Sequence, residues 1–270
     1  MKNKFEILCV TMHQTDFSKI KSMNIHSNVV FANQAGKNSF DEIYFDGHYA
    51  KMITTATRGV GLNRNITLLN ASAEICLFAD DDVVYFNDVE EKVVAEFERH
   101  PDADVIVFNF ETDDVNRKQK KYTKTKKCSK FCRMPWGSIR IAFRLSSLRK
   151  ANVWFSTLFG GGCVFPMGED SMWLNDMKHK GMCFYVSKEI IGTVSFAQST
   201  WFTGHDEKYF FGRGAYLNAV HPKTFFIWLI YTIIRTSKMD SFPVCKKIIW
   251  MFRGRQGHKK NMSFDEFKKE

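Results

Sequence analysis

The sequence lacks an apolar run long enough to cross a membrane and lacks glycine where a dinucleotide-binding turn would need it. Its longest apolar run, Phe225 to Ile234, is too short for a hydrocarbon core of about 30 Å. Met1 to Gln14 contains no sustained apolar segment with a small-residue cleavage site, so we expect no signal peptide. The first predicted strand, Phe5 to Val10, is followed by Thr11 and three further residues without glycine, which argues against a Rossmann cofactor site.

The seven cysteines are an odd number scattered through apolar stretches, which predicts reduced thiols in a cytoplasmic protein. Cys128 and Cys132 have no second Cys/His pair at zinc spacing, so no zinc site is expected. The aromatic content of 15% excludes a disordered chain, and the 26 phenylalanines predict apolar surface available to a membrane or a partner.

Acidic residues are absent from one long segment. Val115 to Lys150 contains 13 Lys or Arg and no Asp or Glu, and residues 205–270 contain 13 basic and 6 acidic residues. Because the whole chain carries +10, the remainder is acidic. Basic blocks of this kind attract phosphate-bearing partners: a nucleotide, an anionic lipid or a nucleic acid. Within the first block, Asn116 to Arg133 has few apolar residues and is expected to be a loop on the acceptor or membrane side.

Short apolar runs alternate with segments of helical periodicity. This pattern predicts an α/β fold with a mostly parallel, Rossmann-like sheet and helices on both of its faces. The expected strands are Phe5–Val10, Val29–Ala32, Lys51–Thr55, Ile75–Ala79, Val105–Phe110, Ile139–Leu145 and Met182–Val186. Four helices are expected in this part of the chain. One begins near Leu62, one runs from Asp88 to Arg99 after a capping box of Asn87 and Glu90, and the other two cover Ser146–Lys150 and Glu169–Lys180.

Three consecutive carboxylates follow one of these strands. Ile75 to Ala79 is a continuous apolar run, typical of a strand buried on both faces, and it delivers Asp80, Asp81 and Asp82 at its carboxyl end. Ligands bind at that end of open α/β sheets. Because adjacent carboxylates repel one another, a divalent ion with phosphate ligands is one explanation for the triplet, and a solvated loop is the other.

Further candidate residues follow other strand ends. Asn33 and Gln34 carry amides that can pair with the edge of a nucleobase. Arg64, in the first turn of its helix, is either a ligand for an anion or a surface charge. Asp170 opens a helix after a glycine-rich turn, as a general base or as a helix cap, and His205 is a candidate metal ligand or phosphate contact.

Together these segments resemble family 2 glycosyltransferases with the GT-A fold. The resemblance rests on Thr11, Asn33-Gln34, the segment 59–65, Asp80-Asp81-Asp82 and Gly168-Glu169-Asp170, in that order. It implies an inverting, metal-dependent hexosyltransferase that takes a sugar from a nucleotide-diphosphate sugar. By the same resemblance Asp80 and Asp82 hold Mn²⁺ or Mg²⁺, Asp170 is the catalytic base, and the nucleotide sugar is bound by Thr11, Asn33, Gln34, Arg64, Asp80 and Asp81.

The resemblance covers about Phe5 to Gly214. We therefore expect a catalytic domain over residues 1–204 and a basic, aromatic region over 205–270. Phe225–Ile234 and Val244–Phe252 are predicted to be amphipathic helices on an anionic membrane surface, or terminal helices packed on the domain. This combination suits an enzyme on the inner face of a bacterial cell membrane that extends a lipid-linked surface glycan. The alternatives are a nucleotidyltransferase, a non-catalytic membrane-associated protein, and a nucleic-acid-binding protein, although no nucleic-acid partner is expected.

Overall fold

The structure, a computed structural model, describes residues 3–112, 121–129, 137–194 and 204–269. Contacts between Cα atoms divide the chain into two compact units. The first comprises Met1–Arg58, Leu62–Phe155 and Trp173–Ser199, and the second Gly59–Gly61, Ser156–Met172 and Thr200–Glu270. The second unit thus takes in residues 59–61, 156–172 and 200–204 from within the predicted catalytic domain, and the functional division into 1–204 and 205–270 stays a prediction.

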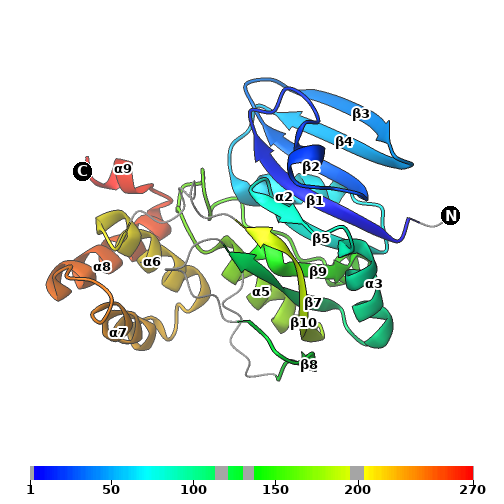
Figure 1. Cartoon of the computed structure of the whole chain (residues 1–270). Coiled ribbons are helices and arrows are strands. Elements are labelled where there is room, and N and C mark those ends of the chain that lie inside the picture. The colour runs from blue at the N-terminus through cyan, green and yellow to red at the C-terminus, as the bar shows by residue number, and fades with distance from the viewer. Residues whose placement is uncertain (1–2, 113–120, 130–136, 195–203, 270) are drawn as a thin grey trace. The chain divides into compact units, whose positions relative to one another are not determined.

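The first unit is built on a ten-stranded sheet (Figure 1). Along the sheet the strands are β3 (Ser39–Phe45), β4 (His48–Thr55), β2 (Asn28–Gln34), β1 (Phe5–Met12), β5 (Ile75–Asp80), β9 (Ile141–Arg144), β7 (Val105–Thr112), β10 (Phe184–Val194) and β6 (Val83–Tyr85), with β8 (Lys126–Lys127) paired to β10. Strands β4, β2, β1 and β5 pair in parallel, as do β7 and β10. Strand β9 lies antiparallel between β5 and β7, so the six longer central strands share one direction and the predicted α/β sheet is confirmed.

Helices cover both faces of this sheet. Alternate residues of β1 face opposite sides: Phe5 and Ile7 join an apolar cluster with α3 (Val89–Arg99) and the end of α1 (Lys19–Ser22). Leu8 joins the other cluster, which includes residues of α2 (Val60–Asn70), α4 (Leu145–Ala151) and the later part of α5 (Glu169–His179). The central strands are thus buried on both sides, as their continuous apolar sequences predict.

Several local predictions were wrong. Strand β3 was not predicted, although Asp46 and Gly47, at φ 45° and 83°, form the tight turn that joins it to β4. The predicted capping box of Asn87 and Glu90 is not formed. The N-cap of α3 is Asp88, whose side chain makes no capping hydrogen bond, and Asn87 instead accepts a hydrogen bond from Asn24 Nδ2 (2.8 Å). Half of the predicted loop over 116–133 lies outside the described residues, and in its described part, residues 121–129, Lys126–Lys127 form strand β8 instead of loop.

The second unit contains four helices in its described C-terminal part: α6 (Glu207–Val220), α7 (Phe225–Thr236), α8 (Val244–Lys260) and α9 (Phe264–Phe267). They enclose an aromatic core that includes Phe159, Phe165, Phe211 and Trp250. The two predicted helices are therefore present as α7 and α8. None of the described helices has the length and apolar character needed to cross a membrane.

Candidate active site

Strand β5 ends in the acidic triplet, and each carboxylate meets a different environment. Asp80 is the last residue of the strand, and its Oδ1 lies 3.3 Å from Nη2 of Arg64. The Arg64 side chain is only 3% exposed and also lies against the Phe155 ring, 5.3 Å from its centroid. Arg64 is therefore a buried partner of Asp80, so the surface-charge alternative was wrong.

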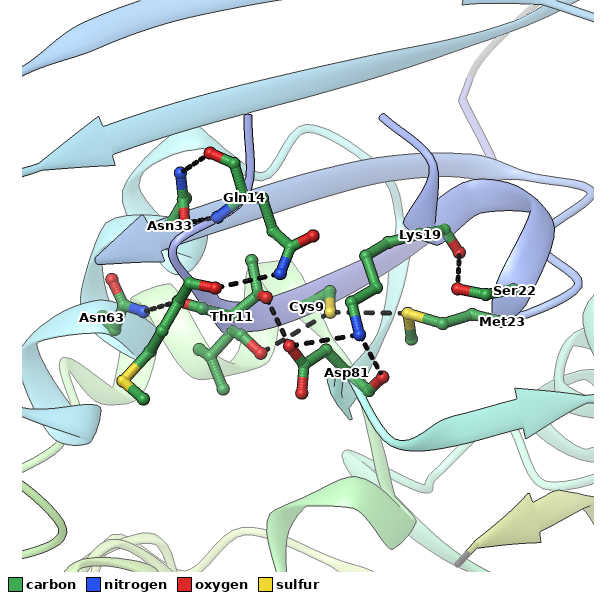
Figure 2. Close-up of polar contacts among 11 residues, drawn as sticks. Cys9, Thr11, Gln14, Lys19, Ser22, Met23, Asn33, Asn63 and Asp81 are labelled. Atoms are coloured by element: carbon green, nitrogen blue, oxygen red, sulfur yellow. Dashed lines mark hydrogen bonds and ion pairs between the residues drawn. The ribbon is translucent and has the colours of Figure 1, made fainter. Parts of the chain in front are cut away.

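Asp81 is held by Thr11, near the end of β1, and by Lys19, at the start of α1 (Figure 2). The Thr11 hydroxyl donates a hydrogen bond to Asp81 Oδ2, and Lys19 Nζ lies 3.5 Å from the same oxygen. Lys19 also donates to the Asp81 backbone carbonyl at 3.1 Å. Thr11 thus lies beside the acidic turn, while its predicted contact with the nucleotide stays a prediction, and Lys19 is a further residue beside this turn that was not predicted. Its position just after the first strand was the available signal, because this places it at the carboxyl edge of the sheet.

Asp82 has no basic side chain within ion-pair distance among the described residues. Partial burial of its carboxyl group, followed by the charges of Asp80 and Asp81, raises the pKa of Asp82 to about 6. Lys19 is close enough to oppose this shift but not to cancel it. The protein therefore neutralises two carboxylates with its own groups and leaves the third as an uncompensated negative charge.

The start of α2 is fastened to the sheet by three consecutive buried side chains. Asn63 Nδ2 donates to the carbonyls of Ala32 (2.8 Å) and Thr11 (3.3 Å), at the ends of β2 and β1. Asn65 exchanges two hydrogen bonds of 2.9 Å with the backbone of Phe155. Arg64, between these two anchors, is consequently held against Asp80 rather than free to sample solvent.

Asn33 lies at the end of its strand as expected, but its side chain already has partners within the protein. The strand register places it beside Thr11 and Thr54 at the same sheet edge, but it is fully buried. Its Nδ2 donates to the carbonyl of Gln14 (2.9 Å), and its Oδ1 accepts from the Gln14 backbone amide (3.0 Å) (Figure 2). The same Nδ2 also donates to Thr54 Oγ1 (3.1 Å). Both ends of the amide are thus used to hold the turn after β1, and pairing with a nucleobase would require these bonds to break. Gln34, next to it, is partly exposed, and its proposed contact with the nucleotide stays a prediction.

The acidic turn fits a divalent cation that is shared with a phosphate ligand. Among the described residues there is no group of three His, Cys, Asp or Glu side chains that could enclose a metal ion. Mg²⁺ and Mn²⁺ bound to nucleotides need fewer protein ligands, because phosphate oxygens and water complete the shell. An exposed carboxylate with a raised pKa beside a second carboxylate supplies the oxygen ligands and the negative charge that such an ion needs.

Asp170 belongs to the second unit, in the first turn of α5. The preceding Gly168 has φ 104°, and a Cβ atom there would lie 2.5 Å from Cδ2 of Tyr216. Glu169 is buried, whereas Asp170 is partly exposed. Since Asp82 lies in the first unit, the prediction that the two aspartates face one pocket stays a prediction.

His205 lies elsewhere in the second unit, with its Nδ1 2.8 Å from Asp240 Oδ2. Lys247 contacts the other oxygen of the same carboxylate at 2.8 Å. Asp240 therefore links His205, which lies two residues before α6, to Lys247 of α8. The predicted metal or phosphate contact of His205 stays a prediction.

The sheet with its acidic turn defines a GT-A type α/β enzyme. The family model described as Glycosyl transferase family 2 matches residues 36–167, a range that includes Arg64 and the acidic triplet and ends before Asp170. The match identifies the protein as a glycosyltransferase, with the family 2 sequence pattern over residues 36–167. Comparison with curated proteins gave no match.

Solved structures support the same fold. The crystal structure of S. aureus TarS 1-349 has a TM-score of 0.58 and 14% identity, covering 97% of this chain and 93% of that one. Its complex with UDP-GlcNAc gives 0.57 and 11%, and its complex with UDP gives 0.56 and 13%, both with the same coverage. At such low identity the similarity establishes the fold alone.

Proposed function

We propose that this glycosyltransferase moves a sugar from a nucleotide-diphosphate sugar to a hydroxyl acceptor, with inversion at the anomeric carbon and with Mn²⁺ or Mg²⁺ bound. The observation that carries the proposal is that only two of the three aspartates have a basic side chain within ion-pair distance among the described residues. Arg64 and Lys19 already compensate Asp80 and Asp81, whereas Asp82 has a raised pKa and no ion-pair partner among the described residues. The charge at Asp82 favours a cation brought in with the donor. UDP-sugars are the first donors to test, since the similar TarS fragment is described in complexes with UDP-GlcNAc and UDP.

Asp82, with Asp80 beside it, would hold the cation. When bound, the cation neutralises the charge that grows on the leaving diphosphate. Arg64 supports this role because it fixes the Asp80 carboxylate, so one acid stays oriented while the other meets the ligand. Thr11 and Lys19 do the same for Asp81 and thereby set the shape of the turn.

Asp170 is proposed as the base that takes the proton from the acceptor hydroxyl while that oxygen attacks the anomeric carbon. A single base and no covalent nucleophile give inversion. The partial exposure of Asp170, at a helix start next to a shaped glycine turn, is consistent with a group that meets an incoming acceptor.

The acceptor is proposed to be a glycan, and in particular one linked to lipid at the inner face of the cell membrane. Two features support this assignment. Five cysteines, Cys9, Cys76, Cys163, Cys183 and Cys245, are free thiols, as expected in the cytoplasm, and residues 205–270 are strongly basic.

The test is calorimetric and kinetic. UDP-sugars are titrated into the protein with Mn²⁺ and with EDTA, and hydrolysis of the same donors is followed. We expect Asp82→Ala to lose metal-dependent donor binding. Asp170→Asn should bind donor nearly as the wild type does and fail to transfer. Donor binding that is equal with Mn²⁺ and EDTA would refute the metal role, and loss of donor binding by Asp170→Asn would make that residue structural.

A further inference from the structure

Helix α7 carries two separate apolar faces. Phe225, Leu229, Thr232 and Thr236 are buried, at the i, i+4, i+7 and i+11 spacing of one helix face. On another face Phe226, Ile230 and Ile234 follow at i, i+4 and i+8, and each is 57–59% exposed. Ile227, at 66%, lies beside them. A helix that only packs on its own unit needs the first face and has no use for the second.

The exposed face continues onto α8. There Cys245, Ile249 and Phe252 are exposed at i, i+4 and i+7. The Phe252 ring lies 5.9 Å from that of Phe226 on α7, so the two exposed faces meet. We call this surface the apolar patch: Phe226, Ile227, Ile230, Ile234, Ile249 and Phe252.

The segment that forms the patch is rich in positive charge. Residues 223–260 contain nine Lys or Arg and one acid, Asp240. That acid is already paired with Lys247, which is fully buried. Arg255 stacks on Phe226 with its guanidinium carbon 5.6 Å from the ring centroid, so a cation lies directly at the edge of the patch. Lys238 and Lys246 are exposed on the adjoining turns.

We propose that this patch docks the protein on an anionic lipid surface. Apolar side chains on one face with a rim of Lys and Arg match a bilayer that offers acyl chains beneath negatively charged headgroups. Partly exposed Trp228 and Tyr231 on the same helix are residues that favour the boundary between headgroups and hydrocarbon. Attachment through such a surface patch is peripheral and reversible. The proposal does not depend on the sugar-transfer chemistry.

Vesicle flotation of the full chain tests this proposal. Vesicles of phosphatidylcholine alone are compared with vesicles that also contain phosphatidylglycerol. We expect binding only to the anionic vesicles, weakening as salt is raised. Ile227→Gln and Ile230→Gln should each lower partition about tenfold, and Lys238→Gln and Lys246→Gln roughly fivefold each.

Matched control variants test whether loss of binding is specific to the patch or follows from losing any exposed apolar or basic side chain. Leu69→Gln removes an equally exposed apolar residue of α2, and Lys37→Gln with Lys150→Gln removes two exposed charges outside the second unit. These variants should bind vesicles as the wild type does. Donor hydrolysis and thermal unfolding of all variants check that they fold.

Three results would overturn the proposal: no binding of the wild type to anionic vesicles, patch variants that bind like the wild type, and controls that lose binding equally. Sedimentation distinguishes a fourth outcome. If the wild type forms dimers that the patch variants cannot form, and neither binds vesicles, the patch is an interface between copies of the chain.

Discussion

Replacing Asp82 with asparagine is expected to stabilise the metal-free protein at neutral pH. The side chain keeps its size and loses a charge that the surroundings disfavour. A rise in pKa from 3.8 to about 6 would correspond to roughly 3 kcal/mol if the site were shielded from water. Because the Asp82 residue is exposed, solvent screens much of this effect, and we expect a gain of about 1 kcal/mol.

The pH dependence follows from the direction of the shift. The folded protein binds the Asp82 proton more tightly than the unfolded chain does, so this group destabilises the fold as pH rises from about 4 through about 6. Above that range the whole cost is present. The variant should therefore exceed the wild type in stability at pH 7.5 and match it near pH 4.

Urea unfolding in EDTA at the two pH values measures this difference. Asp81→Asn is the matched control in the same turn. Asp81 accepts a hydrogen bond from the Thr11 hydroxyl and faces Lys19, so replacing its charge should destabilise the protein at pH 7.5. Mn²⁺ with a UDP-sugar should then reverse the order, since the ligand stabilises the wild type and not Asp82→Asn. An Asp82→Asn variant that is less stable than the wild type in EDTA at pH 7.5 would refute the electrostatic argument.

Two further predictions concern structural supports of the proposed site. Arg64→Met should destabilise the protein by about 2–3 kcal/mol because it leaves the Asp80 carboxylate without its buried partner. Adding Asp80→Asn to this variant should restore part of the lost stability, which a double-mutant cycle of unfolding free energies measures. Gly168→Ala should cost about 2 kcal/mol or more, since its Cβ would collide with Tyr216 at a positive φ; Gly181→Ala, also at positive φ but in open space, is the control and should cost about 1 kcal/mol. Equal unfolding midpoints for the two glycine variants would contradict the collision.

The central strands could be predicted from the sequence because burial on both faces leaves an uninterrupted apolar run. Strand β5 was expected over Ile75–Ala79 and is observed to Asp80. Strand β3 has a different character: it is an edge strand with mostly exposed residues, so no apolar run marks it. Its signal was the Asp46-Gly47 turn, which is favoured in tight hairpins because both residues take positive φ.

The positions of Thr11, Arg64 and Asp80 near one another were also predictable, since strand ends of a parallel sheet converge on one edge. The partner of each carboxylate was not. Lys19 lies 62 residues before Asp81, and nothing in their local sequences links them. Asn33 shows the converse limit: an amide at a strand end looks available in the sequence, whereas the fold uses both of its ends to hold Gln14.

The role of the three aspartates therefore depends on the side chains that contact each of them, which the local sequence does not reveal. Three identical side chains in a row would repel one another and compete for the same ion. Arg64 compensates the first, and Thr11 with Lys19 compensates the second, so their repulsion and their mobility are both reduced. What remains is one carboxylate whose unfavourable charge can be relieved by a cation from outside the chain. On this reasoning, removal of Arg64 or Lys19 would change the charge and shape presented to the donor even if neither residue touches it.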